Sequence, residues 1–282
     1  MIRVALAVLA ALAAFPQPTF RSGVDAVRVD VSVMSGLNPV AGLTAANFEI
    51  LDNGVRQTIA SVSLDTVPLN LILLFDVSGS MAGEPIKDLI DAGHTLVKAL
   101  RPEDSVALMT FSEPVRLAVP LSRQREPLVR ELNGLKATGA TSLHDAVFLA
   151  LQLRPDEADA HPVLLVFSDG RDTGSWLTSG QLLETARRSG MLIHVVELFG
   201  FVQRPNPFTF DLAAAGGGRR WSAESSRDLR ELFGRVLNEL RSRYLLTYYP
   251  SGVQQQGWHD LKVSLKNSRG EVTARPGYFV TP

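Results

Sequence analysis

Between Leu69 and Arg243 the sequence alternates short apolar runs with amphipathic stretches of helical period, and this alternation limits the possible folds more than any other feature. A strand followed by a helix and another strand requires parallel strands joined by crossover helices. The segment therefore predicts an α/β unit with a doubly wound, mostly parallel sheet. Its strands are predicted at NLILLF (70–75), SVALMTF (105–111), VRLAVPL (115–121), PVLLVFS (162–168) and MLIHVVELF (191–199).

Both flanks of this unit change to the period of two that is typical of half-buried strands. VRVDVSV begins at Val27, and FEILDNGVRQTI predicts two strands around the turn Asn53-Gly54. WHDLKVSLK and EVTARPGYFV repeat the pattern near the C-terminus. Each flank alone is too small to hold a core. We therefore expect one small antiparallel β domain, formed by both chain ends, with the α/β unit inserted into it; two independent hairpin appendages are the alternative.

The predicted boundaries divide the chain into four segments. A signal peptide covers residues 1–14, and the N-terminal part of the β domain covers residues 24–65. The inserted α/β domain covers residues 66–243, and the C-terminal part of the β domain covers residues 244–282.

The N-terminal segment MIRVALAVLAALAAFPQP places Arg3 before an apolar run that ends in small residues and prolines. This order is typical of a secretory signal, and the run is shorter than the roughly 20 residues of a membrane-spanning helix. We expect cleavage after residue 14, no membrane span in the mature chain, and a secreted or periplasmic protein. An uncleaved membrane anchor is the alternative interpretation.

Charge and cysteine content exclude several classes of function. The chain has 28 Lys+Arg against 29 Asp+Glu and a pI of about 6.5, so it lacks the basic surface of a nucleic-acid-binding protein. It contains no cysteine, which excludes disulfides, thiolate metal sites and a cysteine nucleophile. Its five histidines form no pair with helical spacing, so a zinc hydrolase has no evident ligand set.

One stretch concentrates polar oxygens at the end of a buried strand. LILLFDVSGSM ends an apolar run with Asp76 and then presents Ser78 and Ser80. In an open parallel sheet, ligands bind outside the carboxyl ends of the strands. A carboxylate and two hydroxyls in a tight loop can direct three oxygens at one point, and Mg²⁺ and Ca²⁺ select such oxygens.

Two further segments offer oxygens of the same kind. Thr141 and Ser142, in TGATSLHDAV, lie close to the start of a predicted helix, although they could also act as simple helix caps. Asp169 follows an apolar strand just as Asp76 does. If the two strands are neighbours, the two carboxylates come close, and like charges at short range need a cation or a proton between them. Together the three segments predict a divalent-cation site.

This order of residues resembles the metal-ion-dependent adhesion site (MIDAS) of the von Willebrand factor type A domain, which has the pattern D-x-S-x-S, then a threonine, then an aspartate. The resemblance covers about residues 68–242. It implies that Ser78, Ser80 and Thr141 contact the ion and that Asp76 and Asp169 hold it directly or through water. A sixth position is left for a carboxylate of a partner. The ion implied is Mg²⁺, or Ca²⁺ or Mn²⁺ in its place.

The flanks also look like those of bacterial secreted proteins related to this domain. VAGLTAANFEILDNGVRQTI precedes the α/β unit, and YLLTYYPSG and ARPGYFV follow it. Ala140 departs from the family pattern, in which many relatives have a second glycine, but it leaves the position of the threonine unchanged.

The resemblance implies an exported adhesion or protein-interaction module that is not an enzyme. Its partner would be a protein that offers an Asp or Glu carboxylate to the metal. One alternative is a structural scaffold with an idle metal site. Another is a phosphatase of the haloacid dehalogenase type, but Ser78 stands where its general acid is needed, and no lysine follows Thr141 before Lys262.

Overall fold

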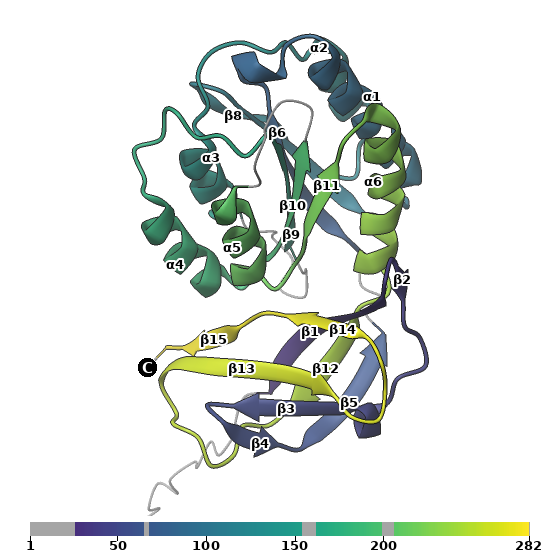
Figure 1. Ribbon diagram of the computed structural model, residues 1–282, viewed down its shortest axis with the longest axis vertical. Coiled ribbons are helices and arrows are strands. Elements are labelled where there is room, and N and C mark those ends of the chain that lie inside the picture. The colour runs from purple at the N-terminus through teal and green to yellow at the C-terminus, as the bar shows by residue number, and fades with distance from the viewer. Residues whose placement is uncertain (1–25, 65–67, 154–161, 199–205, 282) are drawn as a thin grey trace, which may run out of the picture.

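The computed structural model describes residues 26–64, 68–153, 162–198 and 206–281, so the predicted signal peptide lies outside the described residues. An α/β unit packs above a β sandwich, and the sandwich contains both ends of the described chain (Figure 1). No helix among the described residues combines the length and the apolar character needed to cross a membrane.

The α/β unit contains one six-stranded sheet. Its order is β11 (Arg220–Ala223), β10 (Leu192–Leu198), β9 (Pro162–Ser168), β6 (Asn70–Asp76), β7 (Ser105–Phe111) and β8 (Val115–Ser122). All neighbouring strands are parallel except β8, which runs antiparallel to β7 at the edge. The doubly wound, mostly parallel sheet predicted from the sequence is therefore confirmed.

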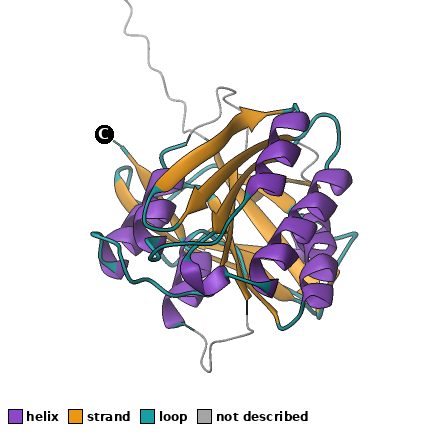
Figure 2. Cartoon of the chain, turned by 90° about the horizontal axis from the view of Figure 1, so that it is seen from above, coloured by secondary structure: helices purple, strands orange, loops and turns teal. Residues whose placement is uncertain are grey.

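Helices cover both faces of this sheet, as the view from above shows (Figure 2). One face carries α1 (Glu84–Ala99), α2 (Glu126–Gly134) and α6 (Ser226–Leu240), and the other carries α3 (Leu143–Ala150), α4 (Ser179–Ser189) and α5 (Pro207–Ala215). Leu71, Leu73 and Phe75 of β6 pack in the first core, and Ile72 and Leu74 pack in the second. Because β6 is buried on both faces, its sequence is continuously apolar rather than alternating.

The β sandwich consists of two antiparallel sheets, and each contains strands from both chain ends. The first has the order β14 (Glu271–Ala274), β1 (Val27–Ser35), β12 (Tyr244–Tyr248) and β5 (Ile59–Leu64), with β2 (Asn38–Pro39) paired to β1. The second has the order β15 (Gly277–Val280), β13 (Gly257–Leu265), β3 (Phe48–Asp52) and β4 (Val55–Gln57). The 3₁₀ turn η1 (Ala45–Asn47) leads into β3.

A buried polar cluster joins the two chain ends inside the sandwich. Asp52 on β3 accepts hydrogen bonds from the hydroxyls of Tyr248 (2.8 Å) and Tyr278 (2.9 Å), and Nδ1 of His259 lies 2.8 Å from its other oxygen. Burial raises the pKa of Tyr278 to about 12 and raises the pKa of Tyr248 as well. All three partners of Asp52 come from the C-terminal segment, so this network connects both parts of the split domain.

The α/β unit directs the carboxyl ends of its parallel strands away from the sandwich (Figure 1). At the opposite end, the buried Arg243 binds Glu239 Oε1 (3.1 Å) and donates to the backbone carbonyls of Asp30 and Gly217, both at 3.2 Å. The chain therefore enters and leaves the α/β unit near the sandwich, and the strand ends that carry Asp76 and Asp169 lie at the far end.

Candidate metal centre

Asp76 is the last residue of β6 and is fully buried. Its Oδ1 accepts the backbone N–H of Ser78 (2.9 Å), and its Oδ2 accepts the hydroxyl of Ser168 (2.7 Å). Both carboxylate oxygens are thereby held in one orientation at the end of the central strand.

Asp169 follows β9, the parallel neighbour of β6, and is also buried. The pKa of Asp76 is raised, mainly because the carboxylate is buried, and the nearby charge of Asp169 raises it further. Hydrogen bonds from Ser78 and Ser168 act in the opposite direction and lower this pKa. Asp169 accepts the backbone N–H of Arg171 (3.0 Å), and the half-exposed Arg171 side chain approaches it at 3.7 Å. Two buried carboxylates that repel each other favour a cation at this position.

The loop after β6 carries both predicted serines. Ser78 is buried, and its Oγ lies 3.1 Å from Oγ of Ser80 at the 3₁₀ turn η2 (Gly79–Met81). Gly79 donates its N–H to the carbonyl of Gly139 (2.9 Å), and a Cβ at Gly79 would lie only 3.2 Å from that oxygen. A side chain at position 79 would therefore crowd the segment that leads to Thr141, against which this loop packs.

Thr141 is buried immediately before α3, and its backbone is fixed on two sides. Its N–H donates to Thr173 Oγ1 (3.0 Å), and its carbonyl accepts the N–H groups of Thr173 (2.8 Å) and Gly174 (2.9 Å). Among the described residues, its hydroxyl has no hydrogen-bond partner. The helix-cap interpretation gains no support, because Ser142 is the residue at the N-cap and its side chain makes no capping hydrogen bond.

The five predicted residues thus come from three loops at the same end of the sheet. Their donor set is two carboxylates and three hydroxyls, all oxygen, which suits Mg²⁺ or Ca²⁺. Among the described residues, no group of three or more His, Cys, Asp or Glu side chains is placed to hold a metal ion, so the hydroxyl groups would have to complete the ligand set. The chemistry of the residues fits a divalent cation.

Ser168 is the residue at this end that the sequence did not single out. It is fully buried, donates to Asp76 and accepts the N–H of Gly170 (3.0 Å), so it joins the two carboxylate-bearing segments. Gly170 has φ +78°, and a Cβ there would approach Oε1 of the buried Glu197 at 2.9 Å. A hydroxyl that ends an otherwise apolar strand is the signal that could have identified Ser168.

The loop after Asp169 is anchored to the start of α3. Asp145 accepts the N–H groups of Trp176 and Leu177, each at 3.0 Å, and Asp172 accepts the hydroxyl of Ser175 (2.6 Å) and the N–H of His144 (3.3 Å). Asp172 therefore holds this loop against the start of α3.

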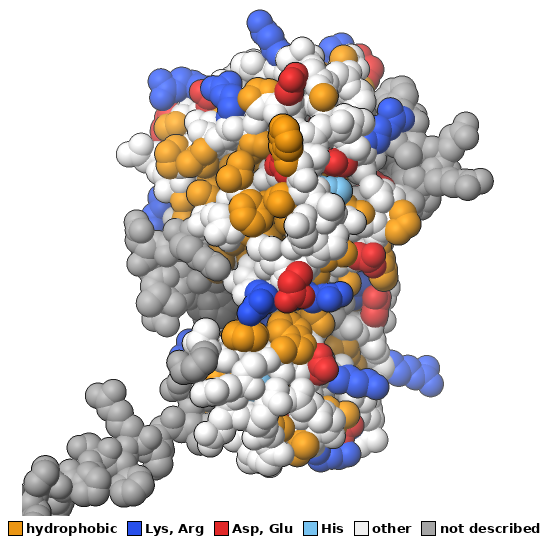
Figure 3. All heavy atoms as spheres, turned by 90° about the vertical axis from the view of Figure 1, so that its left-hand side faces the viewer, with side chains coloured by type: hydrophobic (Ala, Val, Ile, Leu, Met, Phe, Trp, Pro, Cys, Tyr) orange, Lys and Arg blue, Asp and Glu red, His pale blue; other side chains and the backbone are white. Residues whose placement is uncertain are grey.

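The same loop presents Trp176 to solvent, with 94% of its surface exposed. Hydrophobic side chains gather on the face of the α/β unit that carries α3 and α4 (Figure 3). Leu149 on α3 is also an exposed large apolar residue.

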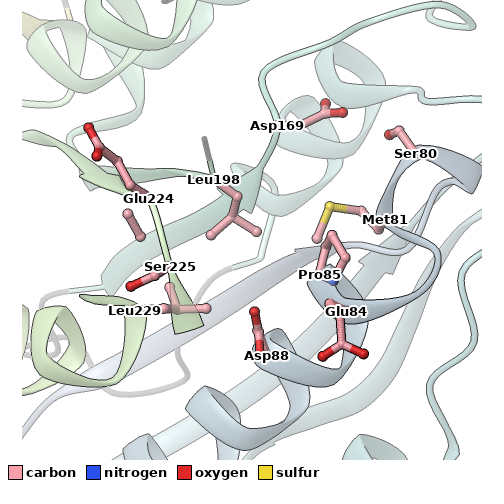
Figure 4. Close-up of a pocket in the computed structure, with 11 residues that line it drawn as sticks. Ser80, Met81, Glu84, Pro85, Asp88, Asp169, Leu198, Glu224, Ser225 and Leu229 are labelled. Atoms are coloured by element: carbon pink, nitrogen blue, oxygen red, sulfur yellow. The ribbon is translucent and has the colours of Figure 1, made fainter. Parts of the chain in front are cut away.

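A pocket of about 200 Å³ lies directly beside the candidate metal centre. Ser80 and Asp169 form one side of it, and the first turns of α1 and α6 form the other (Figure 4). The ends of β10 and β11 complete the wall, through Leu198 and Ala223.

Comparisons with known proteins agree with this architecture. Residues 71–171 match the family model of the von Willebrand factor type A domain. Inter-alpha-trypsin inhibitor heavy chain H4 of Bos taurus is 26% identical over 276 residues, which covers 92% of this chain but only 29% of that protein. The chain therefore spans less than a third of the length of this relative.

Two solved structures are similar in fold. The von Willebrand factor type A protein from Catenulispora acidiphila has a TM-score of 0.55 at 14% identity, covering 83% of this chain and 73% of that one. Proximal thread matrix protein 1 from the mussel byssus, solved with a zinc-occupied MIDAS motif, has a TM-score of 0.55 at 14% identity, covering 67% of this chain and 49% of that one. Together with the sheet topology, these matches show that the α/β unit has the fold of a von Willebrand factor type A domain, and the match to the family model lies within this unit.

Proposed function

We propose that this protein is an exported, metal-dependent adhesion or protein-interaction module, and that it binds an acidic residue of a partner protein through a divalent cation. The proposed ligands are Asp76, Ser78, Ser80, Thr141 and Asp169. The observation that carries the proposal is the convergence of two buried, mutually repelling carboxylates with three neutral hydroxyls at one end of the sheet.

The charge balance of these residues suits an external anionic ligand. Asp76 and Asp169 together balance the charge of a divalent ion, while the three hydroxyls add dipoles but no charge. A bound ion would supply a localised positive charge that attracts a carboxylate. A purely structural site would favour more protein carboxylates and no open position. Mg²⁺ is the proposed ion, with Ca²⁺ or Mn²⁺ as substitutes.

Several observations support an interaction role rather than catalysis. Von Willebrand factor type A domains generally mediate protein–protein interaction. Both oxygens of Asp76 accept hydrogen bonds from the protein, which suits a positioned ligand better than a nucleophile. The mussel protein with a zinc-occupied MIDAS motif supports a metal as the occupant. Export of this chain is proposed from the sequence of residues 1–14.

Metal binding is tested first by thermal unfolding with Mg²⁺ and with a chelator. Wild-type protein should gain RT ln(1 + [Mg²⁺]/Kd), about 2.7 kcal/mol at a hundredfold excess over Kd. Asp76→Ala should lose this gain, and Thr141→Ala should reduce it. Thr185→Ala is the matched control, because the Thr185 hydroxyl only binds a carbonyl within α4. A full Mg²⁺ response in Asp76→Ala would contradict the proposed ligand set.

Partner binding is tested separately by capture of envelope and secreted proteins on immobilised wild type and Thr141→Ala. Mg²⁺ should support capture by the wild type, and chelator or the substitution should remove it. If the metal site is idle, chelator and Thr141→Ala should weaken metal binding in the same way, but the same proteins should still be captured. Capture that is indifferent to both treatments would reject the adhesion mechanism.

A further inference from the structure

The pocket beside the candidate metal centre is continuous with it. Ser80 and Asp169, two of the proposed metal ligands, also line the pocket (Figure 4). A partner that brings a carboxylate to the metal would therefore place its neighbouring side chains over this opening.

The wall of the pocket is mainly apolar. Met81 at the end of η2, Ala223 on β11 and Leu229 on α6 are buried side chains that line it, and Leu198 on β10 joins them. Such a wall suits a side chain with an aliphatic or aromatic stem, whereas a short polar side chain would leave it unfilled.

The charges around this apolar wall all have one sign. Four carboxylates are among the lining residues, namely Glu84, Asp88, Asp169 and Glu224, and no Lys, Arg or His is among them. Lys87 neutralises Glu84, with its Nζ 2.8 Å from Glu84 Oε1. Within the described residues, Asp88 and Glu224 form no ion pair. Figure 4 shows the Asp88 side chain on the α1 side of the pocket.

We propose that this pocket receives a Lys or Arg side chain of the same partner protein whose carboxylate binds the metal. The inference rests on the function proposed above. Lys and Arg combine an apolar stem with a charged head, so the stem packs on Met81 and Leu229 while the head reaches Asp88. Glu224, on the opposite side of the pocket (Figure 4), adds negative charge that attracts the same cation. The partner is then recognised by an acidic and a basic residue that lie close together on its surface.

Other side chains fit this pocket less well. An acidic side chain would be repelled by the lining carboxylates. An apolar side chain would remove water from Asp88 and Glu224 without supplying a hydrogen bond, which is costly. Because the ion's charge is already balanced by Asp76 and Asp169, the charges of Asp88 and Glu224 are left for the partner to compensate.

The test uses a phage-displayed library of random short peptides, selected on the whole protein. Wild type in Mg²⁺ should enrich peptides that carry an Asp or Glu together with a Lys or Arg at constant spacing. The double variant Asp88→Asn/Glu224→Gln should still enrich the acidic residue but not the basic one. A selected peptide should bind this variant about tenfold more weakly than wild type, equivalent to about 1.4 kcal/mol.

The control variant Asp91→Asn/Glu103→Gln removes the same charge from two exposed carboxylates outside the pocket and should select the same peptides as wild type. Both double variants should keep the Mg²⁺-dependent rise in melting temperature, because none of the four residues is a proposed metal ligand. This readout shows that they fold.

Each remaining outcome overturns a defined part of the proposal. If wild type enriches acidic residues without a basic one, or if the Asp88/Glu224 variant keeps the basic preference, the pocket assignment is wrong and the metal mechanism stands. If calorimetry finds a second Mg²⁺ that the pocket variant loses, the pocket is a cation site instead. If no acidic residue is enriched and binding ignores chelator, both the proposed function and this inference are rejected.

Discussion

At the scale of single residues, Ser168 determines how the two buried carboxylates are held. It donates to Asp76 Oδ2 (2.7 Å) and accepts from Gly170 (3.0 Å), all in the buried interior. Ser168→Ala leaves that carboxylate oxygen buried without its donor, so the free energy of unfolding should fall by about 1–3 kcal/mol. The Mg²⁺-induced rise in melting temperature should also shrink, because Asp76 loses its fixed orientation. Urea titration and thermal unfolding with and without Mg²⁺ measure both effects.

Ser63→Ala is the control for this experiment, since Ser63 is an exposed serine on β5. It should change the free energy of unfolding by no more than about 0.5 kcal/mol. Identical unfolding curves for Ser168→Ala and wild type would show that the Ser168 hydroxyl does not support Asp76.

At the scale of elements, the loop between β9 and α4 is fastened to the first turn of α3. The Asp145 carboxylate accepts the N–H groups of Trp176 and Leu177. In the same loop, the hydroxyl of Thr173 accepts the backbone N–H of Thr141. Asp145→Ala should therefore speed amide hydrogen exchange at Trp176 and Leu177 and weaken Mg²⁺ binding. The free energy of unfolding should fall by about 1.5–3 kcal/mol, the range for hydrogen bonds to a charged group. Asp91→Ala, at an exposed position on α1, should leave exchange in this loop unchanged; equal exchange in both variants would contradict the anchoring role.

At the scale of the whole molecule, the split sandwich makes the two chain ends depend on each other. β1 lies between β12 and β14, and β3 pairs with β13, so a chain that ends at Arg243 removes the partners of both. Limited proteolysis with mass spectrometry should then cleave residues 26–64 rapidly while the α/β unit resists. If residues 26–64 stay as protected as in the full chain, the proposed boundaries at 24–65 and 244–282 do not define one domain.

The sequence predicts those parts of the fold in which the pattern of apolar, capping and turn residues matches the burial and conformation that each segment has in the structure. β6 and β9 are apolar throughout because both of their faces are covered. SGQLLETARRS, one of the amphipathic stretches of helical period, forms α4, whose start is fixed by a capping box between Thr178 and Gln181. Asn53-Gly54 gives the turn between β3 and β4, with φ above zero at both residues.

The features that the sequence missed depend on contacts between distant segments. A strand pattern reports burial but not direction, so the antiparallel pairing of β8 was not evident. α5 is apolar on most sides and β11 has only 4 residues, so neither has a clear period. At the candidate site, the spacing grouped Asp76 with Ser78 and Ser80, but the role of Ser168 depends on the register between β6 and β9. The five proposed metal ligands stay a prediction until metal binding is measured.

The pairing of β5 with β12 has a mechanical consequence. Leu64, the last residue of β5, stands opposite Tyr244, the first residue of β12, so the two strands form a hairpin whose loop is an entire domain. The strand ends at Leu64 and Tyr244 lie side by side, while the candidate metal end of the α/β unit faces away from the sandwich (Figure 1). A pull exerted through a partner held at that end would therefore be divided between these two adjacent strand ends. The force would act first on the Leu64–Tyr244 pair. The hydrogen bonds between β5 and β12 would then break one after another from that end, rather than all at once by shear.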